Sequence, residues 1–136
     1  MKKIFLTLAA VSAVLVFSGC QNRGAYLPKN TTKYNYEDTE PLVLMDRMVQ
    51  QSITSPGVQR TVLPDGRLEV VANLRNQEAR RIQVQAQCVF KDGQGFPVDE
   101  TPWVNVFLTE NAQEGVKFTS MNDKAQRFTI RVRQAH

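Results

Sequence analysis

Strict alternation of apolar and polar residues limits what this chain can fold into more than any other feature of its sequence. The pattern runs through residues 67–75, 81–91 and 127–133. Successive side chains of a β-strand point to opposite faces, so a period of two gives one buried and one solvated face. The longest segment has the apolar set Ile82, Val84, Ala86, Cys88 and Phe90. All three segments are therefore predicted to be strands of an antiparallel sheet.

Turn residues separate these strands from several shorter ones. Pro64-Asp65-Gly66 lies between strands predicted at 58–63 and 68–74 and favours a hairpin. Further strands are expected at 96–98, 104–108 and 116–120, with turns at 76–78, 92–95 and 122–124. About seven short strands without a helical crossover pattern predict a single antiparallel, immunoglobulin-like β-sandwich.

This sandwich is expected to occupy 42–136 as the single domain of a 136-residue chain. Its first segment is ambiguous, because Leu42, Met45 and Val49 have helical spacing whereas 42–45 also suits a strand. We favour a short strand followed by one helical turn at 46–50. Cys88 is in phase with the apolar face, so we expect an inert core residue rather than a reactive thiol.

Residues 1–19 have the organisation of a bacterial signal peptide. A short basic start precedes the apolar segment 4–17, and Ser18-Gly19-Cys20 follows it. This apolar segment has 14 residues, fewer than the roughly 20 that a membrane-spanning helix requires. The Ser-Gly-Cys sequence resembles a bacterial lipobox, although Phe17 stands where Leu, Val or Ile is usual.

The lipobox resemblance implies cleavage between Gly19 and Cys20, a diacylglyceryl group on the Cys20 sulfur, and a fatty acyl chain such as palmitate on the new amine. Two or three acyl chains hold a protein stably on a membrane, because each buried CH₂ contributes about 0.8 kcal/mol. Gln21, where Asp would favour inner-membrane retention, implies the inner leaflet of the outer membrane, facing the periplasm. The alternative is an ordinary secretory peptide followed by an incidental cysteine.

Residues 20–41 are expected to form a flexible linker between the lipid and the sandwich. The segment is polar and cannot bury enough apolar surface to order itself. All three tyrosines lie in it, at Tyr26, Tyr34 and Tyr36. They are either anchors of a docking motif or rings that sit at the membrane interface or pack loosely on the domain.

Composition excludes several classes of function. Without residues 1–19 the chain keeps 15 basic and 13 acidic residues, a balance that does not indicate nucleic-acid binding. The single histidine is the C-terminal His136, and there are two cysteines. Metal centres and Ser-His or Cys-His nucleophiles need more of these residues, or a better placed imidazole. We therefore expect no catalytic residue, no metal and no cofactor.

The last strand supplies one candidate binding surface. Arg127, Arg131 and Arg133 share its polar face, and Arg81 and Lys91 are expected on a neighbouring strand. These residues could bind an acidic partner or phospholipid headgroups. The alternative is a solvated face that discourages edge-to-edge pairing of sheets.

The second candidate surface is Trp103 with the loops of Asp92–Pro102. The ring is either a stacking platform for a glycan or peptide, or a core residue that closes one end of the sandwich, which we favour. Asp92, Asp99 and Glu100 could hold a cation or act as a glycosidase pair. Aspartate is also common in turns because its side chain bonds to nearby backbone.

The order of several motifs resembles a known family. They are Gly66–Val70 with Leu74–Asn76, the Phe90–Gly95 turn, Trp103, and the closing segment Phe128–Arg133. Over residues 42–133 the chain resembles the YcfL-like family of small periplasmic lipoproteins without an assigned activity. Ala86 and Cys88 depart from it, since larger aromatic residues are expected there. The resemblance implies an immunoglobulin-like sandwich in the cell envelope and transfers no catalytic residue.

These observations together predict a non-enzymatic, lipid-anchored module that faces the periplasm. We expect it to bind another envelope protein through a sheet face or a free strand edge. The alternative is a module for cell-wall glycan or peptide, centred on Trp103 and the Asp92–Pro102 loops.

Overall fold

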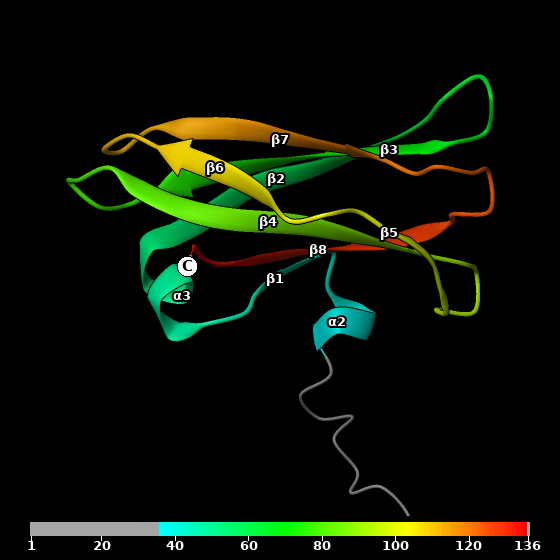
Figure 1. Ribbon diagram of the computed structural model, residues 1–136, viewed down its shortest axis with the longest axis horizontal. Helices are drawn as coiled ribbons and strands as arrows, with labels where there is room; N and C mark the ends of the chain where they lie inside the picture. Colours follow the sequence, from blue (N-terminus) through cyan, green and yellow to red (C-terminus); the bar gives the residue numbers. More distant parts are fainter. Residues whose placement is uncertain (1–35, 136) are drawn as a thin grey trace, which may run out of the picture. The chain divides into compact units, whose positions relative to one another are not determined.

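The computed structural model describes residues 36–135, in which two facing β-sheets form a sandwich (Figure 1). The predicted all-β sandwich is confirmed. No helix within this part of the chain has the length and apolar character needed to cross a membrane. The elements are α2 (Tyr36–Thr39), β1 (Leu42–Leu44), α3 (Arg47–Ser52), β2 (Ile53–Val62), β3 (Leu68–Asn76), β4 (Ile82–Lys91), β5 (Pro97–Glu100), β6 (Val104–Leu108), β7 (Gln113–Thr119) and β8 (Arg127–Gln134).

Strand β4 is the centre of the five-stranded sheet. It pairs with β8 on one side, and with β6 and then β5 along the other. The second sheet has the order β2-β3-β7 and is antiparallel throughout. One pair corrects the wholly antiparallel prediction, because β1 runs parallel to β8. β1 reaches this edge from the N-terminal segment and not through a hairpin, so no turn forces it to run antiparallel.

The core lies between the two sheets and consists of the alternating apolar residues that the sequence indicated. In β3 the buried apolar residues are Leu68, Val70, Ala72 and Leu74, all at most 1% exposed. β4 and β8 bury the facing set Val84, Ala86, Cys88, Phe90, Ile130 and Val132. The polar residues between them therefore point away from the core, which creates an outer face on each sheet.

Cys88 is fully buried in this core, as predicted. Burial, and to a smaller extent the nearby Asp99 carboxylate, raises the pKa of Cys88 to about 12. A thiol that stays protonated at neutral pH is a poor nucleophile. Cys88 therefore contributes packing rather than chemistry.

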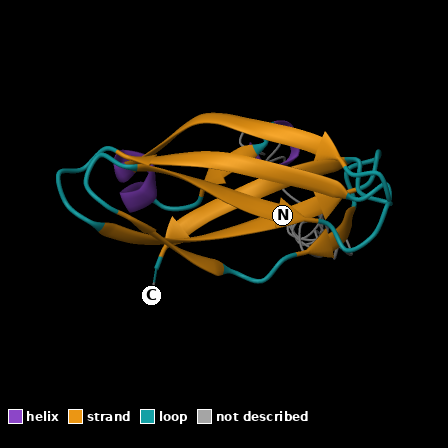
Figure 2. Cartoon of the chain, turned by 90° about the horizontal axis from the view of Figure 1, so that it is seen from above, coloured by secondary structure: helices purple, strands orange, loops and turns teal. Residues whose placement is uncertain are grey.

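The ambiguous segment at 42–53 folds as the sequence favoured, with strand β1 followed by α3. Asp46 caps the helix, since its Oδ1 accepts a hydrogen bond of 2.9 Å from the Val49 amide. Its Oδ2 accepts a second bond, of 2.7 Å, from the Gln134 amide at the end of β8. Figures 1 and 2 both place α3 at one end of the sandwich, where this carboxylate links two segments distant in sequence.

Helix α2 lies within the segment 20–41 that was predicted to be a flexible linker. α2, at Tyr36–Thr39, lies against β4 and β8 and is held there by side chains of both strands. Tyr36 is 56% exposed, so it is not a core anchor. The predicted signal peptide, Cys20, and the tyrosines at 26 and 34 lie outside the described residues.

Candidate functional site

The outer face of the five-stranded sheet gathers most of the residues that the sequence singled out. The register of β4 and β8 places Gln85 opposite Arg133 and Gln87 opposite Arg131. Further along, Val89 lies opposite Thr129 and Lys91 opposite Arg127. The face has two parts. We call Arg81, Gln85, Trp103, Asn105, Phe107 and Arg133 the aromatic platform, and Lys91, Arg127, Thr129 and Arg131 the cationic site.

Trp103 lies on this outer face and not in the core, contrary to the position we favoured. It is partly buried and is not part of the core cluster. The reason is the phase of β6, in which Val106 and Leu108 are buried and the residues alternating with them point outward. The Arg133 guanidinium carbon lies 3.9 Å from the centroid of the Trp103 ring, a cation–π contact.

Hydrogen bonds across three strands hold the platform in place. Arg133 Nε donates to Gln85 Oε1 at 3.0 Å. Gln85 Nε2 in turn donates to Asn105 Oδ1 at 3.1 Å. The guanidinium above the Trp103 ring is thereby fixed in orientation.

A second cation–π pair lies further along β6. The Arg81 guanidinium carbon is 5.1 Å from the centroid of the Phe107 ring, and Phe107 is 50% exposed. Aromatic residues and arginine are enriched at protein interfaces and dominate their hot spots. The platform therefore has the composition of an interface surface.

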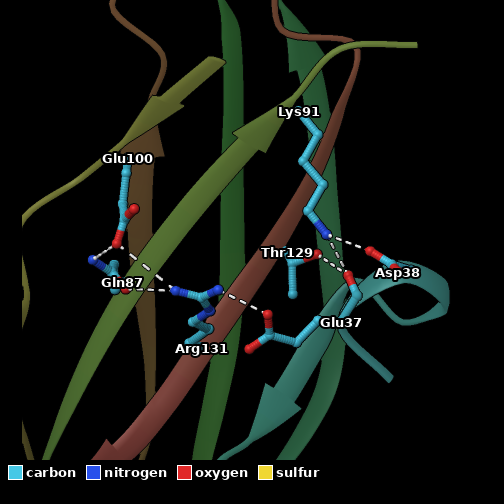
Figure 3. A network of polar contacts seen from close by, with 7 residues as sticks. All are labelled: Glu37, Asp38, Gln87, Lys91, Glu100, Thr129 and Arg131. Atoms are coloured by element: carbon cyan, nitrogen blue, oxygen red, sulfur yellow. Dashed lines mark hydrogen bonds and ion pairs between the residues drawn. The ribbon is translucent and has the colours of Figure 1, made fainter. Parts of the chain in front are cut away.

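The cationic site has an occupant, which is α2. Figure 3 shows Lys91 of β4 and Thr129 and Arg131 of β8 converging on Glu37 and Asp38. Lys91 Nζ donates to the Glu37 carbonyl oxygen at 2.5 Å and pairs with Asp38 Oδ1 at 3.4 Å. Thr129 Oγ1 donates to the same Glu37 carbonyl at 2.7 Å. The Lys91 side chain is 7% exposed, so these partners replace the water that would surround an exposed ammonium group.

Two arginines complete the contacts around α2. Arg131 Nη2 pairs with Glu37 Oε2 at 2.7 Å, and its Nη1 lies 3.8 Å from Glu100 Oε1. Arg127 Nη2 donates to the Asp38 carbonyl oxygen at 2.8 Å. The predicted row of arginines does share one face, but Arg127 and Arg131 are engaged with an acidic segment and do not form an open basic surface.

The two aspartates of the Asp92–Pro102 loops accept hydrogen bonds from backbone amides. Asp92 Oδ1 accepts bonds from the Gln94 and Phe96 amides at 2.9 and 3.0 Å. Asp99 accepts from the Glu100 amide at 2.8 Å and from the Met121 amide at 2.7 Å. These aspartates therefore shape turns, which was one of the two interpretations of the loop.

The comparisons with known proteins agree with this fold. Residues 41–134 match a family model described as a protein of unknown function (DUF1425). The chain belongs to the DUF1425 family. Membership of a small family without an assigned activity was expected, and at that level the expectation is confirmed. No curated protein matches the chain.

Two solved structures resemble this DUF1425 protein. A DUF1425 family member from Shewanella sp. PV-4 is 21% identical with a TM-score of 0.55, covering 62% of this chain and 77% of that one. Campylobacter jejuni cj0090 is 11% identical with a TM-score of 0.58, covering 70% of this chain and 98% of that one. Identities this low support a shared fold and nothing more.

Sequence reasoning missed three important residues of this DUF1425 domain. Glu37 and Asp38 stood inside a polar linker, where no periodic pattern indicated that they dock. Asn76 was noted only as part of a motif. Its Nδ2 donates to the carbonyl oxygens of Arg80 at 2.7 Å, Thr109 at 2.9 Å and Leu108 at 3.3 Å, joining two loops.

Proposed function

We propose that this DUF1425 protein is a lipid-anchored envelope lipoprotein that binds another envelope protein and has no enzymatic role. The aromatic platform carries the proposal, because it sets Trp103 and Phe107 outside the core beside two arginines. The lipobox at Cys20 supports the anchor, and Gln21 supports the periplasmic face of the outer membrane. The resemblance to the YcfL-like family supports the same location.

A protein partner fits the platform better than a glycan does. Sugar rings stack on the open face of an aromatic ring, whereas the Arg133 guanidinium lies 3.9 Å over Trp103. The nearby aspartates, which could bind sugar hydroxyls, already accept backbone hydrogen bonds. A protein interface can use the stacked pair as it stands, since Trp and Arg are favoured hot-spot residues.

Photo-crosslinking in cells tests the platform. A photoreactive amino acid at Asn105, between Trp103 and Phe107, is expected to give a discrete protein adduct. The same probe at Gln59, exposed on β2 of the other sheet, is the control. The adduct should disappear in Trp103→Ala. If the probe at Gln59 gives the same adduct in equal yield, or if Trp103→Ala does not reduce the adduct, the platform is not the binding surface. Sedimentation with peptidoglycan that depends on Trp103 would favour the glycan-binding alternative.

The anchor has an independent test. Cys20→Ala should leave the precursor uncleaved by the lipoprotein peptidase and without acyl chains, as read by mass spectrometry. Gln21→Asp should move the protein from the outer to the inner membrane fraction. Unchanged processing of Cys20→Ala would overturn the lipoprotein assignment.

A further inference from the structure

The cationic site contacts both the backbone and the acidic side chains of α2. Thr129 and Lys91 donate to the Glu37 carbonyl, and Arg127 donates to the Asp38 carbonyl. Arg131 and Lys91 bind the two carboxylates. Every one of these contacts could equally be made to an acidic peptide from another protein.

The contacts described between the occupant and the site are hydrogen bonds and ion pairs. α2 has four residues and buries none of them. The receiving side chains are more deeply buried, since with α2 docked Thr129 is 2% exposed and the Lys91 side chain 7%. A short, polar, covalently attached occupant favours exchange, since attachment supplies an effective concentration in place of intrinsic affinity.

The site also has binding capacity that α2 leaves unused. Arg131 Nε is buried and has no hydrogen-bond partner. A cavity of about 220 Å³ adjoins the site and is lined by residues 37–41 themselves as well as by Arg60, Lys91 and Arg127. An acidic segment longer than α2 that takes its place would reach Arg60 in addition to the residues that hold α2.

We propose that the cationic site binds an acidic peptide segment of a partner protein, in competition with the chain's own Glu37–Asp38. Binding in trans would release α2 and add residues 36–41 to the linker, a gain of about 20 Å at full extension. The site is distinct from the aromatic platform, and the proposal does not require the platform to bind anything.

Binding of a labelled peptide to the full mature chain tests the proposal. The probe is a fluorescent copy of residues 34–41, with the sequence YNYEDTEP. Glu37→Gly with Asp38→Gly removes both carboxylates and makes ordering of α2 more costly. The peptide is expected to bind this variant at least ten-fold more tightly than wild type. A neutral peptide, YNYQNTQP, is the matched control and should not bind.

Substitutions in the cationic site test whether the peptide binds there. Adding Lys91→Met and Arg131→Met to the open variant should weaken binding at least ten-fold. Thr129→Val, which preserves side-chain shape, should weaken it several-fold with the fold intact. Trp103→Ala should leave binding of the peptide unchanged. The result therefore tests the cationic site separately from the proposed role of the aromatic platform.

Three results would overturn the proposal. They are equal affinity of the acidic peptide for wild type and the open variant, no binding to either, and equal binding of the neutral peptide. A fourth comes from vesicles of phosphatidylglycerol. Lys91-dependent binding of these vesicles by the open variant, without binding of the peptide, would assign the site to anionic lipid instead.

Discussion

Replacing Lys91 with methionine should weaken the docking of α2 without lowering the global stability of the domain. Lys91 Nζ donates to the Glu37 carbonyl at 2.5 Å, and a hydrogen bond from a charged donor contributes about 1.5–3 kcal/mol. The ion pair with the half-exposed Asp38 adds at most about 1 kcal/mol. A loss of about 2 kcal/mol would raise the population in which α2 is undocked about 30-fold.

Global stability should not fall in Lys91→Met. Methionine spares the desolvation of a buried ammonium group, and the Asp38 carboxylate left without Lys91 is 56% exposed, so no buried charge loses its partner. The Glu37 carbonyl would still accept the Thr129 hydroxyl, so no backbone acceptor would lose its last partner. Urea unfolding is therefore expected at an equal or higher midpoint.

A glutamyl endopeptidase measures the local change, because cleavage after Glu37 and Glu40 requires α2 to undock. When opening is fast relative to cleavage, the rate follows the open population. Lys117→Met is the matched control, since Lys117 is 63% exposed on the other sheet and lies 3.8 Å from Glu69. It should leave cleavage after Glu37 unchanged. If Lys91→Met lowers global stability strongly and leaves cleavage after Glu37 unaltered, Lys91 stabilises the domain as a whole and does not specifically hold α2.

Three further substitutions test other parts of the structure. Asn76→Asp loses three donated hydrogen bonds and should destabilise the domain by about 2–4 kcal/mol in urea unfolding. Asn122→Asp keeps its acceptor role toward the Lys124 amide and should change stability little; equal losses would contradict the assigned role of Asn76. The raised pKa of Cys88 means that wild type is fully stabilised below about pH 9 and loses stability as the pH rises toward about 12. Its stability advantage over Cys88→Ala should shrink across that range, and a constant difference would argue against burial of a neutral thiol. Arg133→Gln should increase acrylamide quenching of Trp103, the single tryptophan of the chain, and unchanged quenching would mean that the guanidinium does not shield the ring.

Local periodicity made most of the fold predictable. The alternation in β4 located both its core face and its outer face, including the burial of Cys88. The helical spacing of Leu42, Met45 and Val49 indicated a helical turn at 46–50, where α3 begins at Arg47. These features depend on neighbours in the sequence, so the sequence contains the information they require.

Features that depend on distant residues could not be predicted in this way. β1 has three residues, too few for a periodic signal, and its parallel register with β8 is set by tertiary packing. Lys91 and its acceptor Glu37 are 54 residues apart, and Arg131 and Glu37 are 94 apart. The outward position of Trp103 is different, because the apolar alternation of β6 contained that information and the assignment to the core overlooked it.

The electrostatics of β4 and β8 explain why the occupant of the cationic site must be acidic. Among the residue pairs of this register, Lys91 and Arg127 are the pair that sets two cations opposite each other. Like charges at directly opposed positions destabilise a sheet. Arg131 and Arg133, the other two arginines of β8 on this face, lie opposite glutamines. The repulsive pair Lys91–Arg127 is thus at the end of the face where α2 supplies the carboxylates of Glu37 and Asp38. Any segment that displaces α2 must therefore also bring negative charge, since an uncharged replacement would leave Lys91 buried beside Arg127 without compensation.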